Sequence, residues 1–135
     1  MTIKEVSKKY DITAETLRYY ERVGVIPPVN RTTGGIRDFT EEDISWVEHA
    51  KYMRSAGLPI EALIEYLRLF REGDGTFQAR LVLLSEQREL LLTQQQKINE
   101  TLTRLNYKIS CYQEAITTKK LVWSTTNKAN KGEKT

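Results

Sequence analysis

Apolar residues recur at helical spacing along most of the chain, and short polar or glycine-containing stretches separate these periodic segments. A capping box at Thr2 and Glu5, followed by such a segment, predicts a first short helix over residues 3–9. Thr13 is placed to cap a second helix, which Gly24 ends. Two short helices joined by a tight turn are typical of a helix-turn-helix.

The segment that follows is predicted to be a small hairpin over residues 29–39. Gly34 and Gly35 can supply the positive φ angles of a tight turn, and Arg31 and Arg37 flank that turn on either arm. A basic hairpin beside a helix-turn-helix is a wing.

Two more helices are expected after the wing. Thr40 with Asp43 starts a third helix, which Gly57 ends, and Pro59 opens a fourth. A glycine-containing break at residues 73–75 closes this part of the chain.

Beyond the break the apolar period changes to seven residues, which is typical of a coiled coil of about 40 residues. The expected dimerisation positions are Leu84, Leu91, Ile98, Leu102, Leu105, Ile109 and Tyr112. A lone amphipathic helix of this length needs a partner, and the simplest partner is a second copy of the chain. We therefore expect an all-α fold with a small β wing, in which residues 1–72 form the head, residues 76–118 the dimerisation helix, and the Lys-rich residues 119–135 a disordered tail.

Composition narrows the function classes further. The net charge of +3 is mild, so charge alone does not establish nucleic-acid binding. There is no apolar stretch long enough to span a membrane and no apolar signal region at Met1, and the single cysteine, Cys111, fits a reducing cytosol. We find no nucleophile–base motif or phosphate loop, and one cysteine with one histidine, His49, makes a metal site improbable. The expectation is a cytoplasmic, non-enzymatic protein without metal or cofactor.

The most informative run is Leu17-Arg18-Tyr19-Tyr20-Glu21, in the second expected helix. An arginine can form two hydrogen bonds with a guanine edge or contact a phosphate, and tyrosine hydroxyls can donate to phosphate oxygens. Neighbouring tyrosines point about 100° apart on a helix, so one of them can pack into the core while the other stays exposed.

This run, the wing with its Gly-X-Arg sequence, the two following helices and the long C-terminal helix together resemble the MerR family of bacterial transcription regulators. The resemblance covers residues 1–118. It implies a homodimer held by an antiparallel coiled coil, bound to a pseudo-palindromic operator in double-stranded promoter DNA. It also implies that the dimer bends and untwists the spacer between promoter elements, and so acts on RNA polymerase indirectly, through the promoter.

The resemblance assigns DNA contacts to particular side chains. The residues matched in this way, including two weaker matches at Thr16 and Arg31, are Thr16, Arg18, Tyr19, Tyr20, Arg31, Arg37 and Arg54. The segments around the wing and around residues 53–61 look most like the aldehyde- and electrophile-responsive branch. That branch carries a cysteine where this chain has Tyr52, so thiol sensing at that position is out of reach.

Two questions stay open at this point. Cys111 is expected on the flank of the coiled coil, either as a half-exposed residue without a role or as a redox or electrophile sensor. The same architecture also suits a DNA-architectural protein, or an adaptor that uses its coiled coil to bind another protein.

Overall fold

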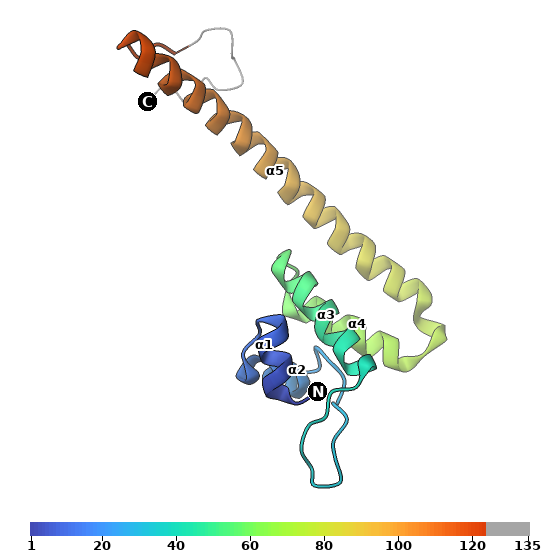
Figure 1. Ribbon diagram of the computed structural model, residues 1–135. Coiled ribbons are helices and arrows are strands. Elements are labelled where there is room, and N and C mark those ends of the chain that lie inside the picture. The colour runs from blue at the N-terminus through green and yellow to red at the C-terminus, as the bar shows by residue number, and fades with distance from the viewer. Residues whose placement is uncertain (124–135) are drawn as a thin grey trace. The chain divides into compact units, whose positions relative to one another are not determined.

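The computed structural model describes residues 1–123, and this part of the chain contains five α-helices and one 3₁₀ turn (Figure 1). The elements are α1 (Ile3–Tyr10), α2 (Ala14–Val23), α3 (Glu41–Ser55), α4 (Ile60–Glu72), η1 (Asp74–Thr76) and α5 (Phe77–Thr118). The chain divides into a first unit, Met1–Glu89, and a second unit from Leu90 onward. The predicted helical fold with a long C-terminal helix is confirmed.

The predicted helix boundaries follow from local hydrogen bonds. The Thr2 hydroxyl accepts from the Glu5 N–H at 3.1 Å, and the Glu5 carboxylate accepts from the Thr2 N–H at 2.9 Å, which completes the capping box of α1. The Thr13 hydroxyl accepts from the Thr16 N–H at 3.0 Å and caps α2. Gly24 ends α2 with a φ of +91°, a left-handed conformation that favours glycine.

The wing is a hairpin closed by one antiparallel bridge between Arg31 and Arg37, and no strand forms among residues 1–123. The Thr32 N–H donates to the Ile36 carbonyl at 2.8 Å, so the loop has three residues. Loops of this length end in one left-handed residue, which explains why Gly35 takes a positive φ of +84°. The prediction that both glycines supply positive φ angles was therefore correct for one of them.

One small core lies in the first unit, where α1 packs against α2 and α3, and α3 packs against α4. Its buried apolar side chains include Val6, Leu17, Tyr20, Val25, Ile26, Phe39, Val47, Ala50, Leu63 and Leu67. Because α2 is buried on one side only, its opposite side is left to solvent. The core thus fixes which face of α2 is presented outward.

The dimerisation positions proposed along α5 are partly or largely exposed in the single chain. The exposed members are Leu84, Ile98, Leu102, Leu105, Ile109 and Tyr112, and Leu91 is half-buried. At the end of α5 the chain reverses at Lys119, and residues 119–123 of the expected disordered tail are described, whereas the rest of that tail lies outside the described residues. None of the described helices is long and apolar enough to cross a membrane.

Candidate nucleic-acid interface

The outward face of α2 presents Arg18 and Tyr19 to solvent, while Leu17 on the same turn is 1% exposed. Within residues 1–123, Arg18 has no hydrogen-bond, ion-pair or ring partner. All five N–H donors of its guanidinium are therefore available to a ligand. An unpaired arginine on an exposed helix face is the group expected to reach a base edge or a phosphate.

Tyr20, to which the resemblance assigns a DNA contact, packs largely into the core. Its side chain is 8% exposed, and its backbone carbonyl accepts from the N–H groups of Gly24 and Val25, at 3.2 and 2.9 Å. The ring lies in the core because position 20 follows Leu17 by almost one helical turn and so shares its inner face. Of the two tyrosines, only Tyr19, which is 36% exposed, remains on the outer face.

The exposed Tyr19 ring and the Thr16 hydroxyl already have neighbours in the free protein. The Arg22 guanidinium lies over the Tyr19 ring, 5.3 Å from its centroid. The Thr13 hydroxyl donates to the Thr16 hydroxyl at 2.8 Å. The stacked Arg22 thus adds a second cation to this face, which the sequence analysis did not assign.

Glu21 connects α2 to the wing, and this role was not predicted. One oxygen of its carboxylate accepts from the Val29 N–H at 2.7 Å, and the other accepts from Arg37 Nε at 2.7 Å. Arg31 Nη2 lies 3.9 Å from the same carboxylate. The Glu21 side chain is 12% exposed, so these contacts are shielded from water and hold the wing against α2.

This ion pair changes the interpretation of the wing arginines. The resemblance assigns a DNA contact to Arg37, and in the structure its charge is paired with Glu21 and its side chain is largely covered. Arg31 is more exposed and donates from Nη1 to the Gly35 carbonyl at 2.9 Å, across the hairpin. The wing is therefore positioned by its arginines, and only part of their donor capacity faces solvent.

A second carboxylate fixes the base of the hairpin. Asp43 Oδ2 accepts from the N–H groups of Thr40, at 2.9 Å, and Asn30, at 3.2 Å. The sequence predicts the first of these bonds as a helix cap. The hydrogen bond from the Asn30 N–H joins residues 13 positions apart, and no local sequence pattern predicts it.

Arg54, to which the resemblance assigns a DNA contact, lies in the last turn of α3. Arg54 Nη1 donates to the Leu58 carbonyl at 2.6 Å and so braces the loop between α3 and α4. The side chain is exposed, and the remaining guanidinium donors are not engaged among the described residues. The geometry leaves Arg54 able to contact phosphate while it stabilises its own loop.

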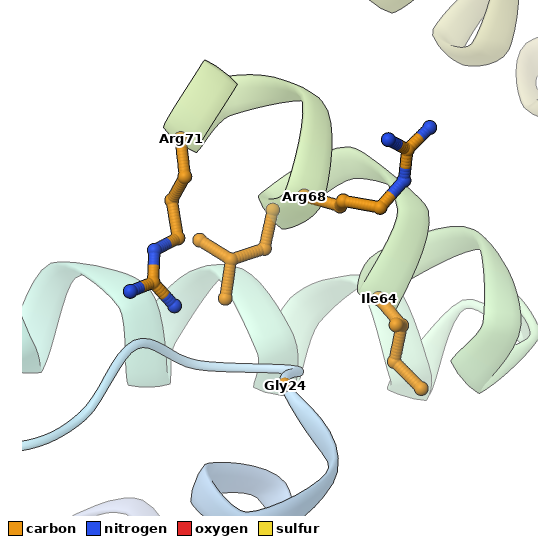
Figure 2. Close-up of a pocket in the computed structure, with 5 residues that line it drawn as sticks. Gly24, Ile64, Arg68 and Arg71 are labelled. Atoms are coloured by element: carbon orange, nitrogen blue, oxygen red, sulfur yellow. The ribbon is translucent and has the colours of Figure 1, made fainter. Parts of the chain in front are cut away.

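Two open hollows lie in the first unit. One, of about 300 Å³, is lined by Gly24 and by a side of α4 that carries Ile64, Leu67, Arg68 and Arg71. Figure 2 shows Ile64 and Arg71 extending from α4 on the side of Gly24, while Arg68 points away from them. Arg68 is paired with Glu65 and Glu72, so the hollow is mainly apolar.

The other hollow, of about 330 Å³, lies between α3 and α4, beside Trp46, His49, Tyr66 and Phe70. The Trp46 and Phe70 rings meet edge to face at 5.0 Å between centroids. His49 Nε2 is buried without a hydrogen-bond partner, and burial lowers the pKa of His49 below its ordinary value. Among the described residues, no group of three or more His, Cys, Asp or Glu side chains is placed to hold a metal ion.

Cys111 is buried in the structure, whereas one of the two alternatives left open by the sequence was a half-exposed residue without a role. Its side chain is 6% exposed although α5 is exposed along most of its length. The heptad pattern describes a helix pair and carries no information on what the chain does after the helix ends. After α5 the chain takes a left-handed turn at Lys119, and the Trp123 ring centroid lies 6.0 Å from that of Tyr107, one helical turn before Cys111.

Comparisons with known proteins agree with this geometry. The family model described as "MerR HTH family regulatory protein" matches residues 1–69. The HTH-type transcriptional regulator AdhR of Bacillus subtilis is 59% identical over 92 residues, which are 68% of this chain and 66% of that protein. The match thus spans just under two thirds of that relative's length.

Two solved structures share the fold over most of the chain. A crystal structure from Listeria monocytogenes, described as a MerR family transcriptional regulator, has a TM-score of 0.83 and 47% identity, and the match covers 87% of this chain and 89% of that one. HiNmlR, described as a MerR family regulator lacking the sensor domain and bound to promoter DNA, has a TM-score of 0.79 and 28% identity, and the match covers 89% and 95%.

Proposed function

The chain belongs to the MerR family of HTH regulatory proteins, and from this premise we propose that it is a transcription regulator that binds promoter DNA as a homodimer. The single observation that carries the proposal is the outer face of α2. This face presents Arg18 without a partner in residues 1–123 and Tyr19 beside Arg22, next to a wing that Glu21 holds in place. HiNmlR, with the same fold, is bound to promoter DNA.

The dimer follows from the exposed side of α5. Side chains such as Ile98 and Leu105, which are 60% and 50% exposed, repeat every seven residues on one side of a 42-residue helix. Exposure of one such apolar row to water is unfavourable, and a second copy of the helix would bury it. We propose that this pairing is the antiparallel coiled coil of the family.

The proposed mechanism is mechanical. Two heads held at a fixed separation bind the two halves of a pseudo-palindromic operator, and the bound DNA between them bends and untwists. The deformation costs of order 1–6 kcal/mol, which protein–DNA contacts repay. RNA polymerase is then affected only through the promoter, and no enzymatic step is involved. This activity takes place in the cytoplasm, where the promoter is.

The proposed DNA contacts are Arg18 and Tyr19 on α2, with Thr16 beside them, Arg31 and Arg37 on the wing, and Arg54 in the last turn of α3. Arg18 is assigned to base readout because it is unpaired. The wing arginines and Arg54 are assigned to phosphate, because each already makes a contact within the protein that fixes its direction.

The proposal is tested on a duplex with a two-fold symmetric operator, obtained by selection from random DNA. Wild type, Arg18→Ala and Lys97→Ala are compared by fluorescence anisotropy, and run-off transcription is measured from a promoter that carries the operator in its spacer. We expect Arg18→Ala to lose affinity and promoter response, and Lys97→Ala, which removes the same charge from an exposed position on α5, to keep both. Equal binding by all three proteins would contradict the assignment.

A further inference from the structure

The end of α5 carries a short return segment, residues 119–123, which we call the strap. Lys119 has a φ of +64°, and its N–H donates to the Ala115 carbonyl at 2.7 Å. The Thr118 hydroxyl donates to the Lys120 carbonyl at 3.1 Å and accepts from the Lys120 N–H at 3.3 Å. The left-handed residue and these bonds end the helix and turn the chain back along it.

Trp123, at the end of the strap, packs against α5. Its ring centroid lies 6.0 Å from that of Tyr107 and 6.1 Å from that of Tyr112, and the Lys108 ammonium lies 5.7 Å from it. Positions 107, 108, 111 and 112 form one patch of the helix surface, because 107 and 111, 108 and 111, and 108 and 112 are three or four residues apart. The Trp123 indole therefore lies against Tyr107, Lys108 and Tyr112, the residues that surround Cys111 in this patch.

Cys111 lies among these residues on the helix surface and is buried. In the described part of the second unit there is one helix and the strap, so the strap is the described element that can cover a helix side chain. Residues adjacent to Cys111 along the chain, Ser110 and Tyr112, are both exposed. Cys111, between them, is 6% exposed.

The strap reaches the edge of the proposed dimer seam, because Trp123 packs against Tyr112, one of the seam positions. At 3.6 residues per turn, Cys111 lies roughly 120–160° around the helix axis from the seam positions Leu105 and Ile109, and about 100° from Tyr112. All three seam residues are exposed in the chain.

We propose that the strap is a lid over Cys111. The thiol reacts with small electrophiles when the strap is released, and a substituent on Sγ and a docked Trp123 exclude each other. The physical basis is close packing, since a patch already filled by an indole has no room for added atoms. Opening is a local event that breaks the few ring and cation contacts of Trp123 with α5. The inference concerns the second unit and does not depend on DNA binding.

The probe is iodoacetamide. The Cys111 thiolate attacks the methylene carbon, a C–S bond forms, the C–I bond breaks, iodide leaves, and the thiol proton goes to the buffer. Because the chain has one cysteine, every alkylation event reports on this position.

The test compares alkylation rates of the full-length wild type, Trp123→Ala and Val122→Ala by mass spectrometry. Val122 is the matched control, since it is apolar, next to Trp123 and 60% exposed. We expect Trp123→Ala to react about tenfold faster than wild type, because the ring and cation contacts that close the strap are lost. Val122→Ala should react like wild type. Equal rates in all three proteins, or equal acceleration in both variants, would overturn the proposal.

A second measurement follows the strap itself. In a Trp46→Phe background, Trp123 is the sole tryptophan. Alkylation should shift its emission to the red and increase its quenching by acrylamide, and Cys111→Ser should abolish both effects. Alkylation of Cys111 that leaves Trp123 emission and quenching unchanged would show that the strap does not cover the thiol.

Discussion

The contact between Glu21 and the wing gives the sharpest stability prediction. In Glu21→Gln the side chain keeps one oxygen, which can still accept from the Val29 N–H. The other oxygen becomes an amide nitrogen, so Arg37 Nε faces a donor in place of the carboxylate that now accepts from it at 2.7 Å. The substitution therefore removes one charge-assisted hydrogen bond and leaves a largely covered guanidinium without its partner.

The magnitude follows from the burial of the two groups. A hydrogen bond to a charged group contributes about 1.5–3 kcal/mol. The Arg37 side chain is 22% exposed, so water can hydrogen-bond to the guanidinium and offset part of this loss. We therefore expect the free energy of unfolding to fall by about 1–2 kcal/mol. For a domain of this size, a loss of 1 kcal/mol lowers the melting temperature by about 4–8 °C.

Urea and thermal unfolding, followed by circular dichroism at one protomer concentration, measure the effect. A fixed concentration is needed because dimer stability depends on it. Glu15→Gln is the matched control, since Glu15 is exposed on the same helix and its carboxylate has no partner among residues 1–123. That variant should stay within about 0.5 kcal/mol of wild type.

A double-mutant cycle with Arg37→Gln isolates the pair. If Glu21 and Arg37 interact as the structure shows, the double variant should lose clearly less stability than the sum of the two single variants. Additivity within about 0.3–0.5 kcal/mol would refute the reasoning that Glu21 holds the wing through Arg37.

Three further predictions concern DNA, the dimer and pH. Arg18→Ala should relax sequence preference, as expected for a lost base contact. Arg37→Ala should change the slope of log affinity against log salt by less than the value of about 0.9 expected for one free phosphate contact, because Glu21 already pairs its charge. Ile98→Asp should shift the protein toward monomer in sedimentation velocity, because it places a charge in the seam, whereas Asn99→Asp, on another side of α5, should not. Burial lowers the pKa of His49 in the folded state, so the unfolded state binds the proton more readily. The contribution of neutral His49 to the free energy of unfolding should therefore be fully present above the ordinary histidine pKa of about 6.5 and decrease as the pH drops below it. The acid-side slope should disappear in His49→Gln, and an unchanged slope would exclude His49 as its source.

Local signals account for most of what the sequence could predict. The caps at Thr2, Thr13 and Thr40 and the stop at Gly24 were predicted correctly because each depends on residues within one helical turn. The hairpin was predicted for the same reason, since its turn needs a left-handed residue that Gly35 provides. The period of seven residues also identified α5 as one long helix.

Long-range contacts account for what the sequence could not show. The carboxylate of Glu21 accepts hydrogen bonds from Arg37 and Val29, which are 16 and 8 positions away in the sequence. No local sequence pattern distinguishes Glu21 from the helix carboxylates that stay exposed. The packing of the strap against α5 could not be predicted either, because the sequence around Trp123 does not indicate which residues its ring contacts. The sequence predicted that one of the two tyrosines could pack into the core, and the structure shows that this residue is Tyr20.

The most direct test of the central claim is selection of DNA ligands from a random duplex library by wild type and Arg18→Ala. The account predicts that wild type enriches one pseudo-palindromic sequence and that Arg18→Ala loses the same base preference in both half-sites. Retention of DNA by wild type without any enriched sequence would instead indicate an architectural protein. No retention at all would contradict the assignment of α2 and the wing as a DNA-binding surface and favour an adaptor.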